Sequence, residues 1–249
     1  MNKIIGVILG VATVGILGYA TYSIIDGNNK MTDFNKYDFA GIIEPTVDNG
    51  NIGDHVKGSK NAPVVIVEYA DFQCSGCAAV NPKVNKLIEK MNDKLAIVYR
   101  NFLLSYHQNA TAAASAAEAA GLQGYWKPYT DLLFEKQDEW FYDNASERTT
   151  HFAQYFEMAT EGKGDIEKFS VDVASTEVSK KISFDMGIGK RIDIEGTPAF
   201  YIDGIKIAWG DQNGGSIIIN GELIEWSEPQ STEEKFIDLF SKIVDAKLR

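Results

Sequence analysis

Cysteine is almost absent from this chain, which has two among its 249 residues, Cys74 and Cys77. A structural disulfide elsewhere in the chain is therefore excluded, and so is an anchor through a lipid-modified cysteine near the N-terminus. Basic residues are also scarce, with 24 Lys and Arg against 35 Asp and Glu. This acidic balance argues against nucleic acid and against anionic lipid surfaces as partners.

One long hydrophobic run is present, from Ile4 to Ile25, and it carries no charged residue. At about 1.5 Å per residue, a helix of this length crosses a bilayer core of roughly 30 Å. We therefore expect a membrane anchor over residues 1–26. A signal peptide cleaved after the Gly-Tyr-Ala tripeptide at residues 18–20 is the alternative. Either segment would carry the rest of the chain across a membrane, to a compartment where disulfides persist.

The two cysteines lie between a predicted strand and a predicted helix. Val64–Val67 is an apolar run typical of a buried strand. After the cysteines, apolar residues recur at helical spacing: Val80, Val84, Leu87, Ile88 and Met91. A helix start presents free N–H groups and the positive end of the helix dipole, and both stabilise a thiolate. Two thiols at this spacing can also close a small disulfide ring, so the pattern predicts a thiol–disulfide exchange site.

A zinc half-site is the alternative explanation of the cysteine pair. Zinc would need two further ligands, and the chain has three histidines, His55, His107 and His151. None of them is paired at a spacing like that of the cysteines, so we expect no bound metal.

The remaining pattern predicts strands, then a helical block, then strands again. Leu95–Phe102 reads as a strand parallel to the first, and Ala110–Gly121 as a helix. Helical spacing continues to about residue 189, and its aromatic residues are expected in the core rather than in a substrate groove: Trp126, Tyr129, Trp140 and Phe141. Two hairpins follow, with Asp-Gly at 203–204 and Asn-Gly at 220–221. The last helix is expected to begin with a capping box at Ser231–Glu234.

This element order resembles the DsbA-like branch of the thioredoxin superfamily. The motifs that carry the resemblance are Ala62-Pro63, Glu68-Tyr-Ala-Asp-Phe-Gln-Cys74-x-x-Cys77, His107 before an alanine-rich helix, Leu132-Leu-Phe-Glu135 and Gly196-Thr-Pro-Ala-Phe200. The resemblance implies an α/β thioredoxin fold with a helical insertion, behind the N-terminal transmembrane helix. The implied layout is an anchor at 1–26, a linker at 27–60, thioredoxin-like parts at 61–104 and 190–249, and the insertion at 105–189. Residues 210–229 have no function that we can assign.

The same resemblance implies a role for each residue of the motifs. Cys74 is the attacking thiol, Cys77 the buried resolving thiol, and Glu68 the acid that moves the proton of Cys77. The alternative for Glu68 is a side chain that points to solvent at the end of its strand. Pro198 is the expected cis-proline, and with Thr197 it would bind an incoming peptide by strand addition. Its alternative is a trans-proline that opens an edge strand.

The dipeptide between the cysteines, Ser75-Gly76, departs from the Pro-His of strong oxidases in the family. It carries no charge, so we expect a Cys74 pKa below that of a free thiol but not extreme, and a less oxidising pair. The predicted function is disulfide formation in exported proteins by an anchored monomer without a cofactor. Reoxidation would come from a quinone-linked membrane partner. The alternatives are a reductase or isomerase of the same fold, fed by an electron-donating membrane partner, and a non-catalytic holdase.

Overall fold

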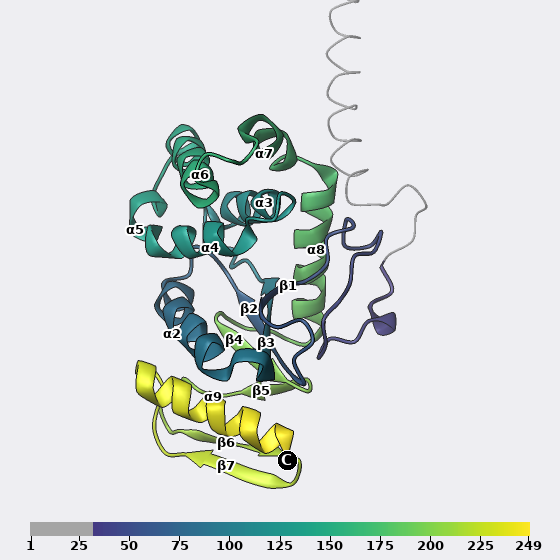
Figure 1. Cartoon of the computed structure of the whole chain (residues 1–249), viewed down its shortest axis with the longest axis vertical. Helices are drawn as coiled ribbons and strands as arrows, with labels where there is room; N and C mark the ends of the chain where they lie inside the picture. Colours follow the sequence, from purple (N-terminus) through teal and green to yellow (C-terminus); the bar gives the residue numbers. More distant parts are fainter. Residues whose placement is uncertain (1–31) are drawn as a thin grey trace, which may run out of the picture. The chain divides into compact units, whose positions relative to one another are not determined.

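The structure is a computed structural model and describes residues 32–249. The described residues before Tyr37 fall outside the main compact unit, and among them Phe34–Lys36 is a single turn of 3-10 helix (η1). Tyr37–Arg249 forms one compact unit, drawn in Figure 1. The membrane anchor expected at 1–26 lies outside the described residues. Between residues 32 and 249, no helix is both long enough and apolar enough to cross a membrane.

The strands of the compact unit form a central sheet and a separate hairpin. In chain order they span His55–Gly58 (β1), Val64–Ala70 (β2), Leu95–Asn101 (β3), Ala199–Ile202 (β4), Ile205–Ile207 (β5), Gly215–Ile219 (β6) and Glu222–Trp226 (β7). The central sheet has the order β1-β3-β2-β4-β5, and β6 pairs with β7. β2 and β3 run parallel because a helix connects them, whereas the other neighbouring strands are antiparallel.

The helices are grouped between β3 and β4, apart from one after β2 and one at the C-terminus. They span Ser75–Met91 (α2), Ala110–Gly121 (α3), Trp126–Glu135 (α4), Gln137–Trp140 (α5), Ala145–Thr160 (α6), Ile166–Asp172 (α7), Thr176–Arg191 (α8) and Glu233–Leu248 (α9), with a 3-10 turn at Asn92–Lys94 (η2). This order confirms the predicted thioredoxin-like α/β fold, including the helical block and both hairpins.

Two hydrophobic cores meet at the start of α2. One lies between the central sheet and helices α2 and α9, where alternate strand residues such as Ile66 and Ile97 are buried. The other fills the helical block and is rich in alanine and aromatic side chains. Cys77 belongs to the second core, whereas Val80 and Val84 of the same helix belong to the first. The first turn of α2 therefore sits at the junction of the two cores.

The segment 210–229, to which the sequence suggested no function, supplies the β6–β7 hairpin. Four hydrophobic side chains of this hairpin are buried in the same core as α9: Ile217, Ile219, Ile224 and Trp226. Figure 1 shows α9 between the central sheet and this hairpin. The hairpin thus covers the face of α9 that the central sheet leaves open.

The part of the linker expected at 27–60 that begins at Tyr37 differs from that prediction. It contains β1, which pairs with β3, and its Ile43 is buried. Arg100 on β3 donates hydrogen bonds of 2.8 Å to the carbonyl oxygens of Phe39 and Gly41. The polar composition of the segment concealed this structure, because its hydrogen-bond partners lie in the sheet and not in its own sequence.

The predicted capping box of the last helix was wrong by one residue. The N-cap is Thr232, whose hydroxyl accepts a hydrogen bond of 3.3 Å from the N–H of Lys235. A capping box needs Glu or Gln at the third helical position, which Lys235 occupies here. Thr232 therefore caps the helix alone.

Candidate redox site

Cys74 stands at the N-cap of α2, directly after the connection from β2. Its backbone is extended, with φ −77° and ψ 120°, and no side chain caps the helix. The N–H of Cys74 donates to the carbonyl oxygen of Asp71 at 3.0 Å, which holds the turn. The N–H groups of the first helical turn therefore remain available to the sulfur, as the sequence predicted.

The two thiols are reduced and differ in exposure. Cys74 is half-buried, and Cys77 is fully buried. The pKa of Cys74 is lowered to about 5, first by a hydrogen bond from the Cys77 thiol and also by the N–H groups of Cys77 and Gly76. Burial raises the pKa of Cys77 well above its usual value, and the hydrogen bond to Cys74 raises it further. The pair therefore combines one acidic, accessible thiol with one that resists ionisation.

The loop before β4 lies against Cys74. The Thr197–Pro198 bond is cis, as predicted. The Cys74 thiol donates a hydrogen bond of 3.3 Å to the carbonyl oxygen of Thr197. A Cβ atom on Gly76 would lie 3.2 Å from Cδ of Pro198, so a side chain there would press on this loop. Ser75 is exposed.

Glu68 is buried beneath the redox pair, on β2. Only 4% of the residue is exposed, so the alternative of a solvent-facing carboxylate is wrong. Desolvation raises the pKa of Glu68 to about 7, although the positive charge of Lys57 opposes the shift. The charge of Glu68 in turn raises the pKa of Cys77, which shows that the two groups are electrostatically coupled.

A family model described as Thioredoxin matches residues 50–215, more than half of the chain. The chain belongs to the thioredoxin family. This match confirms that the predicted resemblance to the thioredoxin superfamily is right. The predicted enzyme class, a protein thiol:disulfide oxidoreductase, is supported by the family and by the cysteine pair.

Solved structures share this thioredoxin-family fold at low sequence identity. Oxidised BdbD from Bacillus subtilis is 17% identical, with a TM-score of 0.55, and the match covers 84% of this chain and 100% of that chain. α-DsbA1 from Wolbachia pipientis is 22% identical, with a TM-score of 0.53, and the match covers 79% of this chain and 94% of that chain. These likenesses show a common fold.

Curated relatives of the chain are much longer than the chain. A protein named Na(+)/H(+) antiporter NhaA 1, from Mycolicibacterium vanbaalenii, is 32% identical over 156 residues, which are 61% of this chain and 24% of the antiporter. A protein named NhaA 3, from Salinispora tropica, is 33% identical over 165 residues, again 24% of its length. The chain thus spans about a quarter of the length of these relatives. Each name describes the whole relative, whereas the match to this chain covers only about a quarter of it.

The sequence prediction missed the polar residues that hold the turn before Cys74. The Asp71 carboxylate accepts hydrogen bonds from the N–H of Gln73 and from Nδ1 of His107, both at 2.8 Å. Gln137 of α5 donates to the carbonyl oxygens of Phe72 and Cys74, at 2.7 and 3.1 Å. The polar Asp71 and Gln73 directly before the first cysteine were the available signal. The partner residues, by contrast, are distant in the sequence.

The aromatic residues of the helical block are mostly core, as predicted. Trp126, Tyr129 and Trp140 are buried, and Phe141 is half-buried. The zinc alternative has no support among residues 32–249, because no group of three metal-ligating side chains occurs there. Each histidine instead contacts a carboxylate. His55 contacts Glu118, His107 contacts Asp71 and His151 contacts Asp143.

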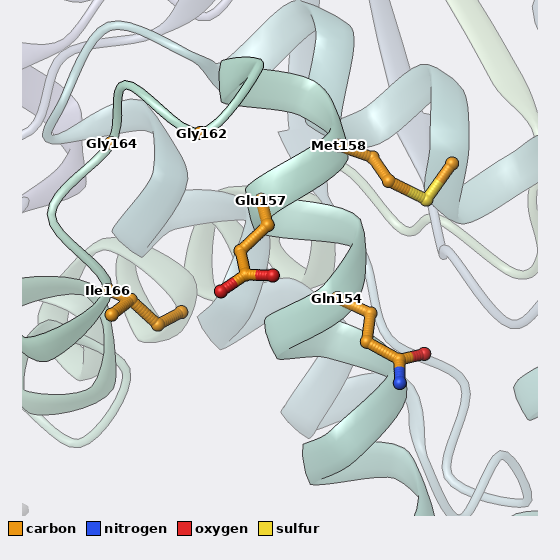
Figure 2. Close-up of a pocket in the computed structure, with 6 residues that line it drawn as sticks. All are labelled: Gln154, Glu157, Met158, Gly162, Gly164 and Ile166. Atoms are coloured by element: carbon orange, nitrogen blue, oxygen red, sulfur yellow. The ribbon is translucent and has the colours of Figure 1, made fainter.

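A surface pocket lies away from these residues, where α6 ends and α7 begins. Figure 2 shows the residues that line it: Gln154, Glu157, Met158, Gly162, Gly164 and Ile166. None of them belongs to α2 or to the cis-proline loop, so the pocket is separate from the redox pair.

The rate at which iodoacetamide alkylates reduced Cys74 is expected to rise with pH around a midpoint near 5, because the thiolate is the nucleophile. Buried Cys77 should remain unmodified over the same period. Mass spectrometry after timed alkylation between pH 4 and 9 measures both rates. A wild-type midpoint above 7 would contradict the acidic thiol.

Proposed function

We propose that this chain is an extracytoplasmic thiol:disulfide oxidoreductase that forms disulfides in exported proteins through Cys74 and Cys77. The observation that carries the proposal is the contrast between the thiols. The pKa of half-buried Cys74 is lowered to about 5, whereas that of buried Cys77 is raised. A stabilised Cys74 thiolate favours the reduced pair, and this makes the disulfide form an electron acceptor.

The reaction needs two thiols of the substrate and no cofactor. A substrate thiolate attacks Sγ of Cys74, the Cys74–Cys77 bond breaks, and its electron pair leaves on Sγ of Cys77. A second substrate thiolate then attacks the substrate sulfur of the mixed disulfide, and Cys74 leaves as a thiolate. The substrate loses two electrons and gains a disulfide, and the enzyme pair gains the two electrons.

Glu68 is the proposed proton donor and acceptor for Cys77. Its pKa of about 7 lies near neutral pH, where a general acid or base works best. Protonated Glu68 would give its proton to the Cys77 thiolate as that thiolate forms. In the reverse direction, the carboxylate would take the proton from the Cys77 thiol.

Thr197 and Pro198 are the proposed binding site for the substrate backbone. The carbonyl oxygen of Thr197 lies 3.3 Å from Sγ of Cys74, so a peptide paired with this residue would bring its own cysteine close to Sγ of Cys74. Recognition by short strand addition uses main-chain hydrogen bonds and tolerates many sequences. This suits an enzyme that acts on many exported proteins.

The proposed location is outside the cytoplasm, on a single N-terminal membrane span over residues 1–26. One structural relative is described as a periplasmic thioredoxin-like protein, from Salmonella enterica serovar Typhimurium. The proposed membrane partner is a quinone-linked oxidase that regenerates the disulfide.

Cys77→Ala is expected to trap mixed disulfides that form when the Cys74 thiolate attacks a disulfide of an exported protein, because Cys77 is then absent and cannot displace that protein. Non-reducing electrophoresis followed by mass spectrometry identifies the trapped partners, and Cys74→Ala is the matched control that should trap none. A holdase without thiol chemistry would trap no partner with either variant.

The direction of electron flow is tested by the reduction potential of the full chain against glutathione buffers. We expect a value between the roughly −270 mV of thioredoxin and the roughly −120 mV of the strongest oxidants. A value at or below that of thioredoxin would contradict the oxidase role and favour a reductase with an electron-donating partner.

Two exposed tyrosines on loops that contact the turn before Cys74 suit a polypeptide substrate: Tyr106 packs against His107, which contacts Asp71, and Tyr142 follows Phe141. Tyr106 is 73% and Tyr142 is 92% exposed. The carbonyl oxygen of Phe141 accepts a hydrogen bond of 2.7 Å from Gln73, which places this loop beside Cys74. Changing both tyrosines to Ser is expected to raise KM several-fold for a reduced polypeptide but not for glutathione. Leu223→Ser, in the distant hairpin and 55% exposed, is the control. An unchanged KM for the polypeptide in the double variant would contradict this role.

A further inference from the structure

The side chain of Gln73, the residue directly before Cys74, is buried although it is polar. The residue is 3% exposed. Its Nε2 donates a hydrogen bond of 2.7 Å to the carbonyl oxygen of Phe141, and its Oε1 accepts one of 2.6 Å from the N–H of Asn109. Both partners are main-chain groups of the helical block, far from Gln73 in the sequence.

The two partners belong to different loops, and each loop carries an exposed tyrosine. Asn109 is the N-cap of α3, and Tyr106 lies on the loop before it. Phe141 follows α5, and Tyr142 is the next residue. Both tyrosines are more than two-thirds exposed. The carboxamide of Gln73 therefore bridges the two loops that present these side chains.

Only a residue with both a donor and an acceptor at its tip can make this bridge. The carbonyl of Phe141 can only accept a hydrogen bond, and the N–H of Asn109 can only donate one. Glutamine offers both functions, whereas lysine has no acceptor and an ionised glutamate has no donor. Two fixed main-chain partners thus explain why this position holds a carboxamide.

Further contacts join the two loops to each other. Nδ2 of Asn109 donates to the carbonyl oxygen of Asp143 at 3.0 Å, and its Oδ1 accepts a hydrogen bond of 2.7 Å from Nη1 of Arg148. The start of α3 and the connection between α5 and α6 are therefore one hydrogen-bonded unit. Gln73 attaches this unit to the residue that precedes the nucleophile.

We propose that Gln73 is a positioning residue for polypeptide substrates, because its carboxamide holds the loops of Tyr106 and Tyr142 at a fixed place beside Cys74. This inference rests on the proposed function and on the role proposed there for the two tyrosines. A substrate segment next to the reacting cysteine meets aromatic side chains on loops that are already ordered, so binding does not have to order them. Glutathione is small enough to react with Cys74 without these contacts.

The redox turn itself does not depend on the carboxamide. The N–H groups of Cys74 and Gln73 donate to the main-chain and side-chain oxygens of Asp71, at 3.0 and 2.8 Å. Gln137 donates to the carbonyl oxygen of Cys74 at 3.1 Å. These bonds use only main-chain atoms of Gln73 and Cys74, so they remain when the side chain of Gln73 changes. We therefore expect the side chain to affect polypeptide binding and not the reactivity of the thiol.

Gln73→Met removes both hydrogen bonds of the side chain at nearly constant length and tests the inference in the full chain. The probes are reduced, unfolded ribonuclease A and glutathione. We expect KM for ribonuclease A to rise about fivefold, the effect of losing one net hydrogen bond, while kcat stays unchanged. The rate with glutathione and the rate at which iodoacetamide alkylates Cys74 should both stay within twofold of wild type. Gln73→Glu is a second variant, which when ionised loses the donor to Phe141 and should raise the same KM.

Gln123→Met is the matched control. The carboxamide of Gln123 also donates to a main-chain carbonyl and accepts from a main-chain N–H, both of Asp165 and both at 2.9 Å. Gln123 lies just beyond the C-terminal end of α3, whereas Asn109 caps the start of that helix. This variant should leave KM unchanged for both probes.

A double-mutant cycle separates positioning from a general loss of structure. In a chain that already carries Tyr106→Ser and Tyr142→Ser, Gln73→Met should raise KM no further, because the side chains that it positions are absent. The inference is wrong if KM for ribonuclease A stays within twofold of wild type in both Gln73 variants. It is also wrong if Gln73→Met raises KM equally with and without the tyrosines, or slows glutathione by the same factor. If wild type oxidises neither probe, the proposed function itself fails.

Discussion

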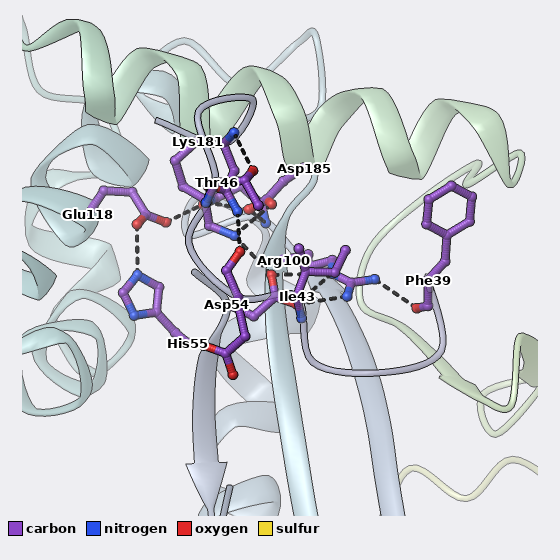
Figure 3. Close-up of polar contacts among 12 residues, drawn as sticks. Phe39, Ile43, Thr46, Asp54, His55, Arg100, Glu118, Lys181 and Asp185 are labelled. Carbon is purple, nitrogen blue, oxygen red and sulfur yellow. Dashed lines mark hydrogen bonds and ion pairs between the residues drawn. The ribbon is translucent and has the colours of Figure 1, made fainter. Parts of the chain in front are cut away.

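The Lys181→Met variant is expected to be less stable to unfolding than wild type by about 3–5 kcal/mol, because it leaves buried carboxylates without their cation. Lys181 of α8 contacts Asp54 at 3.0 Å and Asp185 at 2.7 Å, and all three side chains are fully buried. Figure 3 shows this group together with Arg100, which contacts Asp54 at 2.7 Å. Burial raises the pKa of Asp54, but Lys181 and Arg100 outweigh it and lower that pKa to about 2.

This ion network joins segments that the sequence separates widely. Asp54 precedes β1, Arg100 lies on β3, and Asp185 of α8 accepts a hydrogen bond of 3.1 Å from the N–H of Asn101. Urea unfolding of reduced wild type and Lys181→Met measures the loss. Lys190→Met, on an exposed position of the same helix, is the control and should change stability by about 0.5 kcal/mol or less. A loss below about 1 kcal/mol for Lys181→Met would show that the network does not depend on this cation.

Glu68→Gln is expected to remove the part of the fall in stability between acid and neutral pH that comes from Glu68, while the part from buried Asp185 remains. The folded-state pKa of Glu68 is raised from 4.5 to about 7 by desolvation. Below pH 4.5 the carboxyl is protonated in both the folded and the unfolded chain, and its contribution to stability is fully present. As the pH rises through 7, the unfolded chain has already lost the proton, so the contribution is lost. The difference corresponds to about 3 kcal/mol.

Glutamine has no proton to lose, so the reduced Glu68→Gln variant should be the more stable protein at pH 8, by up to about 3 kcal/mol. The exchange rate should fall in the same variant by about 100-fold, because the proton of Cys77 has no acceptor. Urea unfolding at pH 5 and pH 8 measures the change in stability. The rate of exchange with glutathione at the same two pH values measures the change in activity. Exposed Glu89 on α2 offers the control Glu89→Gln, which should change neither. The role of Glu68 as proton donor and acceptor would be contradicted if the Glu68→Gln variant were less stable than wild type at pH 8 and exchanged with glutathione as fast as wild type.

Lys57 limits how far the pKa of Glu68 rises. Lys57 is buried, and its Nζ contacts Asn81 and, at 3.6 Å, Asp131. Its charge lowers the pKa of Glu68. The sequence offered no sign of this residue's role, because Lys57 fell in the expected linker. A strand pairing at the sheet edge brings it under the redox pair.

The redox pair was predictable because its chemistry is local. The apolar run before Cys74 and the helical spacing after Cys77 place the pair at a helix start, where the backbone itself supplies the N–H groups. The hairpins were predictable for a similar reason, since Asp203-Gly204 and Asn220-Gly221 adopt the positive φ that tight turns require.

The setting of Glu68 was not predictable from strand alternation. β2 is buried along almost its whole length, because helices cover both faces of the sheet, so alternate positions do not separate core from solvent. The same holds for Tyr99 on β3, where every residue is buried. Which buried polar groups face one another depends on strand register, and the register comes from pairing between distant segments.

The sequence by itself determined the fold class, the element order and the position of the two cysteines at a helix start. These follow from local spacing and from the scarcity of cysteine. Only the tertiary structure decided that residues 37–58 belong to the folded unit, that Glu68 is buried beside Tyr99 and near Lys57, and that Thr197 touches Cys74. Each of these depends on desolvation and on contacts between residues far apart in the chain. Burial and pairing set the pKa values on which the proposed chemistry rests.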